Sequence, residues 1–112
     1  MILHLIPRAE WEAARDLPAL SPASLAREGF IHFSTAEQLL ATAGRYYAGR
    51  RDLLVLVVDE ARCAASLRWE ESRPGELFPH LYGPLERAAI TAVLPLELGP
   101  DGFRLPAFDS AT

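Results

Sequence analysis

The sequence predicts one small α+β domain with six or seven short strands and two helices, and three observations lead to this prediction. The chain has 112 residues, which is enough for a single hydrophobic core. Half of its residues are hydrophobic and 23% are charged, a balance typical of a folded domain. Helix patterns occur early and strand patterns dominate later, so the chain is not a repeating β–α–β protein.

The first 33 residues contain two predicted strands and one predicted helix. Residues 1–6 are apolar around His4 and read as a buried strand that ends at Pro7. Proline is favoured in the first turn of a helix, where its missing N–H costs nothing, so residues 8–15 are predicted to be helical. Residues 17–24 contain two prolines and are expected to be an irregular connection. Residues 29–33 (GFIHF) are expected to form the second strand.

A second helix is predicted directly after this strand because the sequence offers two capping boxes in succession. Ser34 and Thr35 are each followed three residues later by a partner, Glu37 or Gln38. In such a box the hydroxyl accepts a hydrogen bond from the backbone N–H three residues later, and the Glu or Gln side chain at that position accepts one from the backbone N–H of the capping residue. Apolar residues at helical spacing follow, and Gly49 is the expected end of the helix.

The second half of the chain is predicted to consist mainly of strands. Residues 53–58 (LLVLVV) form an unbroken apolar run typical of a strand that is buried on both faces. Residues 88–98 form a late strand, and Pro95 indicates that it lies at a sheet edge. The other expectations are a turn at 59–64, a half-exposed strand at 67–70, a loop at 71–76, a short extended piece at 81–82, and a tail at 99–112 with little order apart from 103–105.

Composition excludes several classes of function. The net charge of −4 and the pI near 5.3 argue against extended nucleic-acid or anionic-membrane binding. No apolar run approaches the roughly 20 residues of a membrane span, and Pro7 interrupts residues 1–6 too early for a signal peptide. A single cysteine, Cys63, favours a reducing cytoplasm. All 11 basic residues are arginines, so lysine-based Schiff-base or phosphate-loop chemistry is excluded.

Three histidines, each in a strand-like segment, are the main candidates for chemistry. A single histidine in a strand is ordinarily structural, but His4, His32 and His80 all occur in this context. His32 and Ser34 lie on the same face of a strand, beside the N-terminus of the predicted helix. This arrangement suits an anion or a sugar hydroxyl. The alternative is that Ser34 and Thr35 only cap the helix.

A second cluster lies in residues 78–85 (FPHLYGPL). His80 and Tyr82 share a face before a Gly-Pro turn, which suits stacking on a planar ligand, although core aromatics at a turn are the alternative. Trp69 and Glu70 come from the nearest acidic segment, and such acidic residues are usually only solvated. Histidines and a glutamate could ligate a metal, but no HxH, HxxxH or HExxH spacing is present. Cys63 has no neighbouring histidine that would activate its thiol.

The order of these motifs resembles the family catalogued as domain of unknown function 952. The segments that carry the resemblance are MILHLI, GFIHFST, LLVLVVD, LRWE and ELFPHLYGPL, and they cover residues 1–98 as one domain with 99–112 as a C-terminal tail. Members of this family resemble the ADP-ribosyltransferase fold. The resemblance therefore implies a small split, mainly antiparallel sheet around a cleft that binds NAD.

A looser similarity links residues 31–59 to RNA 2′-phosphotransferases, which share that fold and use NAD. The comparison implies that His4 holds a ribose of the adenosine half and that His32 and Ser34 line the cleft. The chain departs from the pattern at Leu5, where the phosphotransferases have arginine. Arg27 and Arg68 are the nearest candidates for phosphate contacts. The carboxylate that stabilises the oxocarbenium-like transition state is left open among three residues: Glu70, Glu76 and Glu86.

We therefore expect a cytoplasmic protein that binds NAD, ADP-ribose or a related nucleotide in a histidine-lined cleft, with cleavage of NAD or transfer of ADP-ribose as its candidate activity. In this hypothesis His32, His80 and Glu70 are catalytic. The ligand contacts are His4, Ser34, Thr35, Trp69 and Tyr82. The alternatives are a binding module without turnover and a metal-dependent hydrolase that uses the three histidines.

Overall fold

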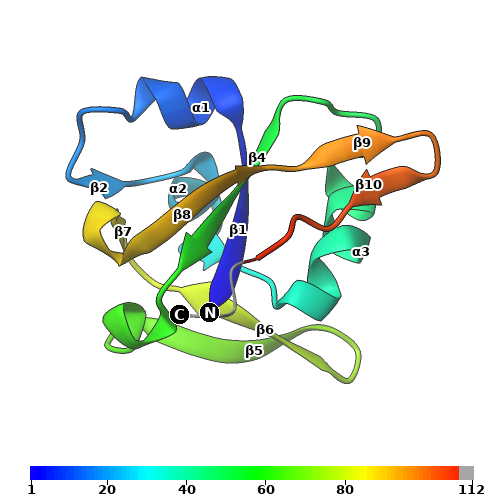
Figure 1. The fold of residues 1–112 in the computed structure, drawn as a ribbon. Coiled ribbons are helices and arrows are strands. Elements are labelled where there is room, and N and C mark those ends of the chain that lie inside the picture. Colours follow the sequence, from blue (N-terminus) through cyan, green and yellow to red (C-terminus); the bar gives the residue numbers. More distant parts are fainter. Residues whose placement is uncertain (109–112) are drawn as a thin grey trace.

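The computed structural model describes residues 1–108, and these form an α+β fold with mostly antiparallel sheets and three short α-helices (Figure 1). The helices are α1 (Arg8–Ala13), α2 (Ala23–Glu28) and α3 (Ala36–Tyr46). The strands are β1 (Ile2–Pro7), β2 (Ala19–Leu20), β3 (Ile31–His32), β4 (Leu53–Val58), β5 (Leu67–Arg73), β6 (Glu76–Leu81), β7 (Leu85–Glu86), β8 (Ile90–Pro95), β9 (Glu97–Gly99) and β10 (Gly102–Arg104). Two 3₁₀ turns cover Glu60–Cys63 and Arg87–Ala89.

The central sheet has the order β1–β4–β8, and both of its pairs are antiparallel. Strand β4 is buried along its whole length, as its apolar run predicts. Side chains alternate between the two faces of a strand, so Leu56 packs in one core cluster and Val55 in the other. Strand β8 pairs only with β4 among the described residues, which confirms the predicted edge position at Pro95.

A second sheet, with the order β3–β6–β5, meets the central sheet at one point. The backbones of Leu3 and Ser34 exchange two hydrogen bonds of 2.9 and 2.8 Å, which join β1 to the residue just after β3. Within the second sheet, His32 of β3 lies directly opposite His80 of β6. The end of β3 and the start of α3 are therefore fixed beside β1, where His4 is located.

Helix α3 begins where the capping signal predicts. Of the two overlapping boxes, the structure uses the one made by Thr35 and Gln38, in which side chain and backbone bond reciprocally at 3.3 and 3.0 Å. Gln38 also donates to the carbonyl of Leu77 at 2.8 Å, which ties the helix to β6. Its apolar face, with Leu39 and Ala43, packs in the cluster on one side of the central sheet.

Three predictions of local structure within residues 17–76 need correction. Residues 17–24 are not an irregular connection, because they contain β2 and the start of α2; the prolines there precede these elements instead of preventing them. The strand predicted over 29–33 is only Ile31–His32, since α2 and its cap extend to Gly29. Residues 71–76 are not a loop, because β5 and β6 continue to a tight turn at Pro74 and Gly75.

The tail predicted over 99–112 is more regular than expected. Strands β9 and β10 pair as an antiparallel hairpin, and Phe103 packs against the core cluster that contains Leu39. Residues 109–112 of the predicted tail lie outside the described residues. No helix within residues 1–108 is both long enough and apolar enough to cross a bilayer.

Candidate functional site

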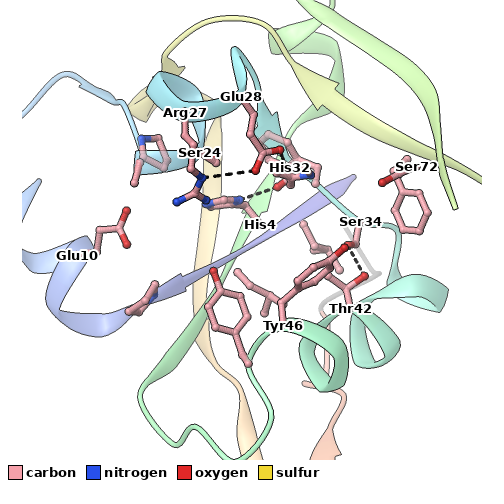
Figure 2. Close-up of a pocket in the computed structure, with 18 of the residues that line it drawn as sticks. His4, Glu10, Ser24, Arg27, Glu28, His32, Ser34, Thr42, Tyr46 and Ser72 are labelled. Carbon is pink, nitrogen blue, oxygen red and sulfur yellow. Dashed lines mark hydrogen bonds and ion pairs between the residues drawn. The ribbon is translucent and has the colours of Figure 1, made fainter.

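A cavity of about 530 Å³ lies where β1, α2, β3, α3 and β5 meet (Figure 2). Strand β1 contributes His4, the residues around β3 contribute His32 and Ser34, and α2 contributes Arg27 and Glu28. This volume falls within the range of ordinary small-molecule sites. The meeting of the two sheets therefore creates a hollow, and three of the residues predicted for a site line it.

His4 is fixed in one chemical form at this cavity. Its Nδ1 lies 2.7 Å from the backbone carbonyl of His32, which can only accept a hydrogen bond, so Nδ1 carries the proton. Burial lowers the pKa of His4 to about 4, and the ring is therefore neutral at pH 7. Its Nε2 is then a hydrogen-bond acceptor, and no described residue donates to it. Figure 2 shows the ring between Arg27 and Ser34.

Three arginines and two carboxylates also line the cavity. Arg27 is mostly exposed and lies 3.7 Å from Glu28, while Arg50 forms a bidentate pair with Asp52. Glu28 accepts a 2.6 Å hydrogen bond from Nε2 of His32, and this bond lowers the pKa of the Glu28 carboxyl. The lining thus carries one formal positive charge in excess, in a chain whose net charge is −4.

Hydroxyl groups complete the lining. Arg73 donates to Thr42 at 2.9 Å and stacks over the ring of Phe78 at 4.8 Å, so its guanidinium is held in place. The Ser34 hydroxyl lies 3.4 Å from that of Thr42, a long contact that leaves it able to bind a ligand. The Ser24 hydroxyl is buried and has no partner among the described residues. Together these groups can bind an anion with several oxygens.

His80, Glu70 and Tyr82 form a separate cluster beside the cavity. His80 Nδ1 and the Tyr82 hydroxyl both donate to the same oxygen of Glu70, at 2.9 and 2.6 Å. The ring of Phe30 stacks on that of His80 with 4.1 Å between centroids, and the ring of His32 lies 5.3 Å from it. The three histidines therefore converge, but His80 is not part of the cavity wall.

The remaining predicted site residues lie elsewhere or serve the fold. Thr35 caps α3 and is not a lining residue. Trp69 donates to Glu60 at 3.0 Å, away from the cavity. Cys63 is buried in the core, where burial raises the pKa of its thiol, so it has the character of a packing residue. No group of three or more potential metal ligands occurs within residues 1–108, and the metal alternative gains no support from the geometry.

Sequence reasoning missed part of the lining. Arg50, Arg73 and Thr42 come from a loop, a strand end and a helix face that meet only in three dimensions. The sequence carries no local signal that joins them. Only the end of α2 carries a local signal, since Gly29 is the type of residue that ends a helix.

Comparison with protein-family models identifies the family, and comparison with solved structures finds similar proteins. The family model described as protein of unknown function (DUF952) matches residues 5–93. The chain is similar to the crystal structure of protein CC0527 from Caulobacter crescentus, with 38% identity, a TM-score of 0.83, and coverage of 91% of this chain and 90% of that one. The solution NMR structure of CC0527 gives 38% identity and a TM-score of 0.79, with coverage of 91% and 89%. No curated protein matches the sequence.

Proposed function

The chain belongs to the DUF952 family, whose description states no activity, and from its cavity we propose that it binds NAD, ADP-ribose or a related nucleotide. One observation carries the proposal: a neutral His4, with its Nε2 lone pair free, lines a cavity that three arginines also line. A nucleotide matches both features, because its ribose hydroxyls can donate a hydrogen bond to Nε2 of His4 and its phosphates attract the arginine guanidinium groups.

In this proposal His4 Nε2 accepts a hydrogen bond from a ribose hydroxyl, and Ser34 contributes a second polar contact nearby. Arg27 and Arg73 are the residues for phosphate oxygens, since neither forms a close bidentate pair with a carboxylate as Arg50 does. Tyr47 lines the cavity and is half-buried, so its ring offers a surface for a base. The guanidinium groups of Arg27 and Arg73 favour an anion over a neutral sugar.

Cleavage of the nicotinamide–ribose bond is the candidate reaction. It requires a carboxylate close to the ribose, and among the described residues Glu10 and Glu28 line the cavity. Glu28 already accepts a hydrogen bond from His32, a pair that could relay a proton. Glu70, in contrast, is engaged by His80 and Tyr82 outside the cavity wall. This engagement favours the second candidate function, a nucleotide-binding module without turnover.

Calorimetric titration with NAD and with ADP-ribose tests the proposal, and an assay for nicotinamide release separates enzyme from module. We expect saturable binding of at least one nucleotide and a loss of roughly tenfold in affinity for His4→Ala, the value of one hydrogen bond to a ligand. Arg62→Ala is the control, because Arg62 is exposed and lies outside the lining. Absence of binding by the wild-type protein refutes the proposal.

A further inference from the structure

His80 has a buried ring nitrogen that the fold does not use. Its Nδ1 donates to the Glu70 carboxylate, so Nε2 is the ring nitrogen that is left for another partner. The side chain is only 6% exposed, and Nε2 has no partner among the described residues. Buried polar atoms are nearly always paired in folded proteins, so this atom calls for an explanation.

The ring of Phe30 fills a slot between three other rings. Its centroid lies 4.1 Å from that of His80, in a stacked arrangement, and 4.7 Å from that of His32, edge-on. The ring of Tyr82 forms the third side, with 5.3 Å between its centroid and that of Phe30. The bonds to Glu70 hold the rings of His80 and Tyr82 in place, so the walls of the slot are supported independently of Phe30.

Phe30 belongs to a short connection and not to a helix or strand. It lies in the two-residue link between α2 and β3, directly after Gly29, whose φ of 87° is a conformation that glycine adopts freely. The structure describes every residue of α2, and none of these residues is fully buried. Helix α2 lines the nucleotide cavity, and the bond from Glu28 to His32 holds its last residue.

His32 connects the two sites. Its ring lies 5.3 Å from that of His80 and also lines the cavity, where Figure 2 shows it beside Glu28. His32 therefore borders both the cavity and the ring of His80 that Phe30 covers. The slot has room for one six-membered ring, because it already holds one.

We propose that the slot between His32, His80 and Tyr82 is a binding site for a planar nitrogen heteroaromatic ring, and that Phe30 is the plug that this ring displaces. The inference rests on the proposed function for the identity of the ligand, whose base or nicotinamide supplies the ring. The incoming ring replaces the stacking of Phe30 on His80. Nε2 lies at the edge of the His80 ring and bonds in the ring plane, so it is available to a polar substituent of the ligand or to a water molecule at the edge of the slot.

NMR of the wild-type protein tests the displacement with three probes: nicotinamide mononucleotide, AMP and ribose 5-phosphate. We expect one ring-bearing probe to abolish the cross-relaxation between the rings of Phe30 and His80, and the responding probe identifies which ring enters. Ribose 5-phosphate, which lacks a ring, should shift His4 alone. Persistence of the Phe30–His80 signal while a ring-bearing probe saturates the His4 shift overturns the inference.

A variant tests the slot without the nucleotide cavity. Phe30→Ala should bind free adenine or nicotinamide roughly tenfold more tightly than the wild type, with shifts at His80 and Tyr82. Phe30→Leu, which keeps the slot filled, is the matched control and should gain nothing. A folded Phe30→Ala protein that gains no affinity for either base also overturns the inference, whereas failure of the nucleotides to shift His4 counts against the proposed function alone. If Phe30→Ala does not fold, the wild-type experiment decides.

Discussion

At the scale of single residues, burial gives the three histidines different roles. His4 is enclosed and neutral, and its proton is placed by the carbonyl of His32. His32 is partly exposed and bonds a carboxylate of a neighbouring helix. His80 is enclosed again, but beside Glu70, which bonds its Nδ1. Histidine therefore serves as a fixed hydrogen-bond acceptor at His4, as a link between two elements at His32, and as a buried ring with an unpartnered nitrogen at His80.

The buried state of His4 should appear in the pH dependence of stability. The pKa of His4 is about 4 in the folded protein and near 6.5 when unfolded, so between these values the unfolded chain binds one more proton. The free energy of unfolding is therefore higher above pH 6.5 than at low pH. This difference of roughly 3 kcal/mol is lost as the pH falls from 6.5 toward 4.

Urea unfolding at pH values between 5 and 7 measures this effect. In the wild type the free energy of unfolding should fall by roughly 2 kcal/mol in all between pH 7 and pH 5, with the steepest fall below pH 6, beyond any change that His4→Gln shows. The variant cannot titrate at this position and is therefore the control for the other groups. Equal slopes in the two proteins would show that folding leaves the pKa of His4 unchanged, and the ring would then not be held neutral by burial.

At the scale of elements, the sequence predicts those whose signals are local. Residues 53–58 are a buried strand because no polar residue interrupts them, and α3 begins at a capping box. Helix α2 was missed because it is short and has no fully buried residue, so no apolar periodicity marks it. The β5–β6 hairpin was predicted too short because its exposed end, residues 71–76, is polar. There the Pro-Gly pair marks the turn itself, and Gly75 has a φ of 76°.

The capping box of α3 permits a test at this scale. The sequence leaves open whether Ser34 or Thr35 caps the helix, and the structure selects Thr35. Thr35→Ala should therefore destabilise the protein by about 1 kcal/mol, the usual cost of a lost cap. Chemical denaturation measures the change.

Ser34→Ala is the matched comparison, because Ser34 precedes the cap and its hydroxyl makes only the long contact with Thr42. We expect this change to cost less stability than Thr35→Ala and to weaken nucleotide binding instead, because Ser34 lines the cavity. A larger loss of stability for Ser34→Ala than for Thr35→Ala would mean that Ser34, and not Thr35, caps α3.

At the scale of the whole molecule, the site arises from the meeting of two sheets. The sequence predicts that His4, His32 and Ser34 belong to one site, and the bridge between Leu3 and Ser34 brings their strands together. The arginines could not be predicted in the same way, because Arg50 and Arg73 reach the cavity from elements that are distant in sequence. Which residues line such a cavity depends on long-range packing that no local pattern encodes.

The central sheet should carry most of the stability, since it is covered on both faces. Leu56 of β4 is fully buried in one core cluster, and Leu56→Ala should cost about 3 kcal/mol through lost burial and a residual cavity. Val93→Ala on the edge strand β8, where the side chain is 36% exposed, should change the stability by less than about 0.5 kcal/mol. Thermal and urea unfolding compare the two, and similar losses would contradict the placement of β8 at an edge.

Binding at the junction of the two sheets should stabilise the molecule as one unit. A ligand that binds only the folded state adds about 2.7 kcal/mol at a concentration one hundred times its Kd, which for a chain of this length raises the Tm by roughly 10 °C. ADP-ribose should therefore raise the Tm of the wild type. It should raise that of His4→Ala much less at the same concentration, because the variant lacks the acceptor for the ribose. The shift should also shrink as the salt concentration rises, since the arginines of the lining attract the phosphates through a screened interaction. An equal shift in both proteins would mean that the nucleotide binds elsewhere, and His4 would then be a residue of the core.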